Sequence, residues 1–161
     1  MKHRKDRKAE EEVFHPGDIR VAPLVPTRDS PDHEMRESLE MMCRAATAQG
    51  IKVYNPRFGR ASAVHHNRNA LITDLLKSRM PFSHVFFVDD DMICPPDTIP
   101  RLLAHKKDIV AGLCTCRVDP PLPNARMWNE ETQRWEELFQ WQDGLVEVGG
   151  VGTACMLISL Y

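Results

Sequence analysis

Residues 84–91 read HVFFVDDD, a short apolar run that leads directly into three aspartates. A continuous apolar run is typical of a strand buried on both faces, as in parallel sheets that helices cover on each side. In an open parallel sheet, ligands bind at the carboxyl ends of the strands. This stretch therefore predicts an α/β fold and also indicates the edge of the sheet at which a site would lie.

The flanking sequence continues this alternation of strands and helices. Ser30 has the chemistry of a helix N-cap with Pro31 at the first helical position, and Gly50 follows the last helix-period residue. We expect alternating strands and helices at residues 19–25, 30–50, 51–54, 62–79, 84–88, 97–106 and 109–117. This order is typical of parallel strands joined by right-handed crossovers, so we expect a Rossmann-like sandwich with a mostly parallel central sheet.

After Pro123 the pattern changes to short segments separated by turns. We expect a C-terminal β-hairpin portion with strands at residues 125–128, 135–139 and 145–148, followed by another buried strand at 153–158. The chain stops at Tyr161, directly after that apolar strand. We therefore expect a truncated or minimal form of a longer fold.

Composition limits the classes of protein that fit. Residues 1–13 are mostly charged and predict a disordered tail, which leaves 14–161 as one domain. The formal net charge of −2 disfavours a nucleic-acid partner, and the sequence contains no apolar run long enough for a transmembrane segment. Five scattered cysteines, an odd number, favour reduced, buried thiols and a cytoplasmic protein.

The three aspartates after the apolar run suggest a metal site. If the strand geometry continues, Asp89 and Asp91 point to one side and Asp90 to the other. Two carboxylates about 5 Å apart repel by roughly 3 kcal/mol at an effective dielectric of about 20, and a divalent cation removes that repulsion. Clustered oxygen ligands suit Mg²⁺ or Mn²⁺. The alternative is a solvated acidic turn that caps the next helix.

Arg68 lies on the expected second helix, on the same side as the apolar residues Val64, Leu71 and Leu75. An inward-facing arginine needs an anion, and its planar fork suits a phosphate or a carboxylate. One interpretation is a bound phosphate, and the other is an internal salt bridge to one of the three aspartates. Both place Arg68 near the acidic cluster.

These motifs together resemble a known family. A first strand that ends in Pro-Thr, the RNAL of residues 68–71, the VFFVDDDM of residues 85–92 and the later Gly-x-Gly at 150–152 resemble the GT-A fold glycosyltransferases. The resemblance is to their family 2-like members, within the nucleotide-diphospho-sugar transferase superfamily, and it spans roughly residues 19–160.

The resemblance implies a nucleotide-sugar donor site. Pro26 and Thr27 would lie beside the base and ribose, and Asn55 stands where many relatives carry an aspartate that reads the base. The remaining implied positions are Asp89 on the ribose side, Arg68 near the diphosphate, and Asp89 and Asp91 as metal ligands. Asn69 and Asp90 complete the implied nucleotide-sugar-binding residues. The resemblance leaves the catalytic base unidentified.

The expected function is metal-dependent transfer of a sugar from a nucleoside-diphosphate sugar to an unknown hydroxyl acceptor, with Mn²⁺ or Mg²⁺ as cofactor. One alternative is a sugar-phosphate nucleotidyltransferase. It is disfavoured because the turn at residues 26–30 lacks the glycine-rich loop of those enzymes. The other alternative is a non-catalytic nucleotide-binding module.

Overall fold

The computed structural model describes residues 18–60, 63–116, 118–140 and 144–161. The predicted tail at 1–13 lies outside these ranges, as does residue 62, the first of the second expected helix. Among the helices in the described part of the chain, none is both long and apolar enough to cross a bilayer.

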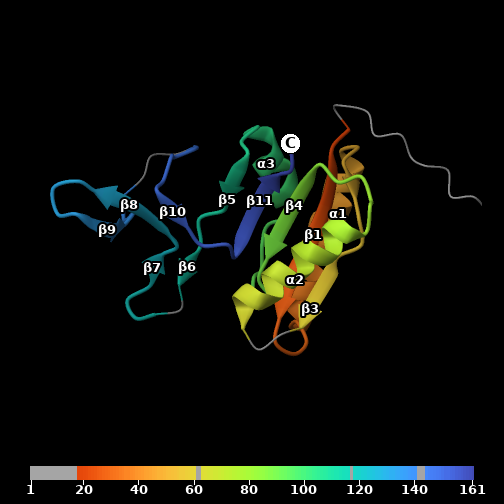
Figure 1. Ribbon diagram of the computed structural model, residues 1–161, viewed down its shortest axis with the longest axis horizontal. Coiled ribbons are helices and arrows are strands. Elements are labelled where there is room, and N and C mark those ends of the chain that lie inside the picture. Colours follow the sequence, from red (N-terminus) through yellow and green to blue (C-terminus); the bar gives the residue numbers. More distant parts are fainter. Residues whose placement is uncertain (1–17, 61–62, 117, 141–143) are drawn as a thin grey trace, which may run out of the picture.

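The central sheet has the order β2-β1-β4-β11-β5, and β3 also pairs with β1 (Figure 1). Strand β1 runs parallel to β2, β3 and β4, whereas β11 lies antiparallel between β4 and β5. The strands are β1 (Arg20–Thr27), β2 (Lys52–Val53), β3 (Arg57–Arg60), β4 (His84–Val88), β5 (Ile109–Ala111) and β11 (Cys155–Ser159).

The prediction of a Rossmann-like sandwich with a mostly parallel sheet is therefore wrong. Of the eight strand pairings in the described residues, three are parallel and five are antiparallel. The apolar pattern of β11 predicts a buried strand. A buried strand can run either parallel or antiparallel to its neighbours, so the pattern does not predict the direction. The fold is a small α/β structure with a mixed sheet.

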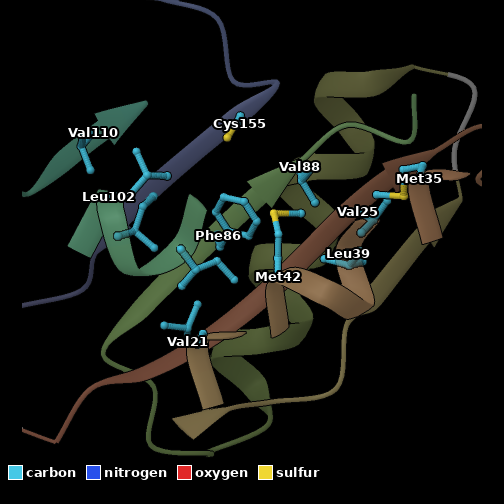
Figure 2. Close-up of a cluster of buried hydrophobic side chains, with 13 residues drawn as sticks. Val21, Val25, Met35, Leu39, Met42, Phe86, Val88, Leu102, Val110 and Cys155 are labelled. Atoms are coloured by element: carbon cyan, nitrogen blue, oxygen red, sulfur yellow. The ribbon is translucent and has the colours of Figure 1, made fainter. Parts of the chain in front are cut away.

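Helices cover both faces of this sheet. Helices α1 (His33–Ala48) and α3 (Thr98–Ala104) pack over the larger core cluster, which Figure 2 shows, and α2 (Val64–Lys77) packs over the smaller one. Strand β4 contributes Phe86 and Val88 to the first cluster and Val85 and Phe87 to the second. This two-sided burial explains why residues 85–88 are continuously apolar.

The ends of α1 differ in how well the sequence predicted them. The helix begins at His33 after Asp32, so the expected N-cap at Ser30 is wrong, and the backbone N–H of Arg36 bonds the carbonyl of Asp32 at 3.1 Å. Gly50 ends the helix as expected, with φ of 82° and its N–H bonded to the carbonyl of Thr47 at 2.9 Å.

The expected fourth strand is divided at Gly112. Residues beyond it form a two-stranded sheet of β6 (Thr115–Cys116) and β7 (Leu122–Pro123). A three-stranded antiparallel sheet follows, made of β8 (Ala125–Asn129), β9 (Arg134–Glu137) and β10 (Gly150–Val151), and it extends away from the central sheet (Figure 1). The strand expected at 145–148 is absent from these described residues, and β10 pairs with β8 instead.

Candidate functional site

A pocket lies where β1 ends. Because β1 and β4 are parallel, with Leu24 opposite Phe87, their carboxyl ends meet at the same edge of the sheet. The pocket has a volume of about 190 Å³. Its lining residues are Pro26, Thr27, Arg28, Asp29, Ser30, Val64, Asn67 and Asp90.

Asn67 holds the end of β1 in place. Its side-chain Nδ2 donates to the carbonyl oxygens of Thr27 and Gly59, each at 2.9 Å. These two acceptors lie on the paired strands β1 and β3, so one buried amide from α2 joins both strands to the helix. A Cβ at position 59 would collide with Oδ1 of Asn67, which explains the glycine there.

Thr27, one of the residues that line this pocket, has a buried hydroxyl without a partner within the described part of the chain. The residue is 3% exposed, and its Oγ1 has no hydrogen-bond partner among the described residues. A buried polar atom without a partner costs about 1–3 kcal/mol. A polar ligand group that bonds this hydroxyl would recover that energy.

Asp89 is paired with Arg68. The guanidinium Nη2 of Arg68 donates to Oδ1 of Asp89 at 2.5 Å, and both side chains are largely buried. Burial raises the pKa of the Asp89 carboxyl above its ordinary value, although Arg68 acts in the opposite direction. Of the two interpretations of Arg68, the structure shows the internal ion pair. The Nε of Arg68 is also buried and has no partner in the described chain.

The other two aspartates differ in environment. Asp90 is half-buried and lines the pocket beside Thr27, whereas Asp91 is exposed. Within the described residues, no three His, Cys, Asp or Glu side chains lie close enough together to hold a metal ion. A cation here would take one or two carboxylates from the protein and its remaining ligands from phosphate and water. That is the usual way in which Mg²⁺ is bound, so the residues fit such an ion.

The structure brings together only part of the predicted site. Pro26, Thr27 and Asp90 line one pocket, and Arg68 and Asp89 contact each other. Asn55 and Asn69 are exposed and do not line that pocket.

Sequence reasoning missed Asn67. The buried residues of α2 are Asn67, Leu71 and Leu75, which are spaced four residues apart. The inward face is thus centred one position before Arg68, and Val64 is 38% exposed. A polar residue in register with two leucines was the signal that could have identified Asn67.

Comparison with known proteins adds a match to a solved structure. No family model and no curated protein matches the sequence. Among solved structures, A197 from STIV matches with a TM-score of 0.54 and 14% sequence identity. The match covers 88% of this chain and 65% of A197, so the chain spans about two thirds of the length of that protein. At this identity the likeness establishes a shared fold.

Proposed function

We propose that this chain binds a nucleoside-diphosphate sugar together with Mg²⁺ or Mn²⁺, and that it is a glycosyltransferase or the donor-binding part of one. The observation that carries the proposal is the position of the pocket. The pocket at the end of β1 and the acidic residues 89–91 after β4 occupy one edge of the sheet. This is the edge at which open α/β sheets bind ligands.

The pocket is suited to the nucleoside. Its volume of about 190 Å³ matches a base or ribose better than a complete nucleotide sugar. Thr27, whose hydroxyl has no partner, and Asp90 line this space, and their side-chain oxygens would bond the hydroxyl or amide groups of the nucleoside. The diphosphate would then lie outside the pocket, toward residues 89 and 91.

Arg68 and the acidic residues would hold the diphosphate. Asp91 and Asp89 would bind the metal ion, and the guanidinium of Arg68, which is partly exposed, would bond a phosphate oxygen. The ion, when bound, supplies positive charge to the diphosphate that leaves as the sugar departs. Arg68 contributes charge at the same place while it also holds Asp89.

The proposal is tested by ligand-induced thermal stabilisation of the protein. UDP, GDP and their sugars would each be added with and without Mn²⁺, and the melting temperature recorded. We expect one nucleotide series to raise the melting temperature only when the metal is present. Failure of every nucleotide and nucleotide sugar to stabilise the chain would contradict the proposal.

A pair of variants localises the effect. Asp91→Asn should abolish the metal-dependent stabilisation, because it removes a charged metal ligand. Asp108→Asn is the matched control. Strands β4 and β5 both run antiparallel to β11, so Asp108, just before β5, lies at the opposite edge of the sheet from Asp91. Equal loss of binding in both variants would place the metal elsewhere.

Turnover is measured separately. Release of nucleoside diphosphate from the stabilising donor, with water or added saccharides as acceptor, distinguishes a transferase from a module that only binds the nucleotide.

A further inference from the structure

The three-stranded sheet presents two tryptophans on one face. Trp128 on β8 lies opposite Trp135 on β9, and their rings meet edge to face with centroids 5.3 Å apart. Residues directly opposite each other in an antiparallel pair share a face of the sheet. Trp128 is 39% exposed and Trp135 is 51% exposed. In Figure 1 the helices of the described chain lie over the central sheet, away from β8 and β9, so this aromatic face is open to solvent.

The indole of Trp135 is held in place across the sheet. It lies against Gly149, the residue before β10, because a Cβ there would be 2.6 Å from Cζ3 of the indole and 3.0 Å from Cη2. Since β8 lies between β9 and β10, the ring crosses β8 to reach this glycine. A ligand that stacks on a ring already fixed in position does not have to order that ring when it binds.

A charged pair lies on the same face, beside the tryptophans. Arg126 precedes Trp128 by two residues and Glu137 follows Trp135 by two, so the alternation of side chains places all four on one face. Nη2 of Arg126 lies 3.2 Å from Oε1 of Glu137, and both side chains are partly exposed. A guanidinium and a carboxylate donate to and accept from hydroxyl groups. Flat apolar rings next to such groups match a sugar, which has apolar C–H faces and polar hydroxyls.

The size of the aromatic face favours a small ligand over a second protein. The exposed parts of the two tryptophans together amount to about one side chain, roughly 150–250 Å². A stable protein interface buries about 800 Å² on each partner. The tryptophan pair therefore fits a ligand of a few sugar rings.

The aromatic face is connected to the proposed metal site by a short path. Strand β10 ends at Val151, which pairs with Ala125, the first residue of β8. Three residues after Val151, the carbonyl of Ala154 accepts a hydrogen bond from the N–H of Asp89 at 3.0 Å. At about 3.3 Å per residue, Trp128 lies within roughly 30 Å of Asp89. A linear saccharide held on the tryptophans can therefore extend toward the end of β4.

We propose that the face of β8 and β9 that carries Trp128 and Trp135 binds a saccharide, and that this saccharide is the acceptor of the sugar transfer. The indoles would stack on the C–H faces of the sugar rings, and Arg126 and Glu137 would bond their hydroxyl groups. The acceptor role rests on the proposed function, whereas saccharide binding needs only the residues of β8 and β9.

Saccharide binding is tested by NMR on the isotope-labelled full chain, without nucleotide or metal. The probes are hexasaccharides of glucose (cellohexaose and maltohexaose), of mannose and of N-acetylglucosamine, and each is titrated while the indole N–H signals are recorded. Trp128→Phe and Trp135→Phe identify the two signals. We expect at least one probe to shift both of them. If no probe shifts either signal, the proposal is wrong.

Substitutions locate the binding surface. Trp128→Ala and Trp135→Ala should each weaken saccharide affinity by about tenfold or more, because each removes apolar contact area. Met127→Ala is the matched control, since Met127 is 40% exposed, like Trp128, but lies on the opposite face of β8. Circular dichroism checks that each variant folds, and Trp135→Phe, which keeps a ring, should bind with intermediate affinity. Equal affinity in all of these variants would place the saccharide elsewhere and overturn the proposal.

Sedimentation equilibrium of the free protein tests whether a second copy covers this face instead. Self-association that Trp135→Ala abolishes would identify a protein interface and overturn the proposal. A sedimentation profile of a single species that is the same in both proteins supports the saccharide site.

The acceptor role has a separate readout. With the donor that stabilises the protein, the KM for the bound probe should rise about tenfold in Trp135→Ala, while the donor-induced rise in melting temperature stays unchanged. A probe that binds but receives no sugar would overturn the acceptor role. If no nucleotide stabilises the protein while saccharide binding persists, the proposed function and the acceptor role fail, and the saccharide site stands.

Discussion

The side-chain oxygen of Asn67 occupies the space in which a side chain at position 59 would begin. A Cβ on Gly59 would collide with Oδ1 of Asn67 and would lie 2.8 Å from Cγ of Leu71. The same asparagine bonds the carbonyls of Thr27 and Gly59, so the glycine allows α2 to approach the end of β1 closely. The shape of the pocket at the end of β1 therefore depends on Gly59, which does not itself line the pocket.

Gly59→Ala should destabilise the protein by about 1–3 kcal/mol, the usual range for overpacking a well-packed interior. Chemical denaturation followed by circular dichroism measures the change. Gly150→Ala is the matched control, because a Cβ there would meet nothing within 4 Å. If the two variants unfolded at the same denaturant concentration, β3 and α2 would not be in the close contact described here.

Thr27→Val should change stability and ligand binding in opposite directions. The substitution removes the unsatisfied buried hydroxyl while keeping the side-chain shape, so the free protein should gain about 1 kcal/mol. Affinity for the stabilising nucleotide should fall, because the hydroxyl would be a ligand contact. Denaturation and calorimetric titration measure the two effects, with Thr73→Val on the exposed side of α2 as control. Unchanged affinity would exclude Thr27 from the binding site.

The Asp89 carboxyl should titrate above its ordinary pKa of 3.8, since burial raises the value more than Arg68 lowers it. Arg68→Gln removes both the charge and the hydrogen bond that lower it, so the pKa should rise further. Carbon-detected NMR titration of the aspartate carboxyls measures both values. Arg101→Gln, which affects only the exposed Asp97, should leave Asp89 unchanged. A lower Asp89 pKa in Arg68→Gln would contradict the conclusion that Arg68 lowers the pKa of this carboxyl.

This shift has a consequence for stability with a definite sign. A carboxyl with a raised pKa in the folded state holds its proton more tightly there than in the unfolded chain. Its contribution therefore favours folding in acid and is lost as the pH rises from 3.8 through the folded value. In Arg68→Gln this loss of stability should begin at the same pH, and it should extend to higher pH because the folded-state pKa of Asp89 is higher there.

Ser38→Ala should destabilise the protein by about 1–3 kcal/mol, because it leaves the N–H and carbonyl of Cys94 without their partner. Thermal and denaturant unfolding would measure the loss. Thr47→Ala on the same helix is the control, since its hydroxyl bonds only the carbonyl of Cys43 on an exposed face. Equal stability of the two variants would show that Ser38 does not anchor the segment after residue 91.

The sequence predicted those parts of the fold that depend on local pattern. The apolar run at 84–88 forms β4 with the bounds expected, and Gly50 follows α1 at a positive φ. The direction of β11 was not predictable, because strand direction depends on the chain path between residues far apart. Strand β3 was missed because its sequence, RFGR, is mostly polar, and its position depends on pairing with β1.

The candidate site was predictable to a similar extent. The end of β1 and the acidic residues after β4 follow from the rule for strand ends, and the structure places Thr27 and Asp90 in one pocket. The face of α2 was misjudged by one residue, so Arg68 received the inward position that Asn67 holds. Asn55 was placed by resemblance alone, and it is exposed, two residues before the unpredicted β3.

The insertion of β11 between β4 and β5 also constrains how the protein is made. Residues 155–159 leave the ribosome after β4 and β5, yet they join these two strands, which lie some 70 and 45 residues earlier in the chain. Until then β4 and β5 expose unpaired backbone edges, which are sites of aggregation in nascent chains. Completion of the sheet therefore waits until residues 155–159 have emerged, and a ribosome stalled before residue 155 would carry an open sheet.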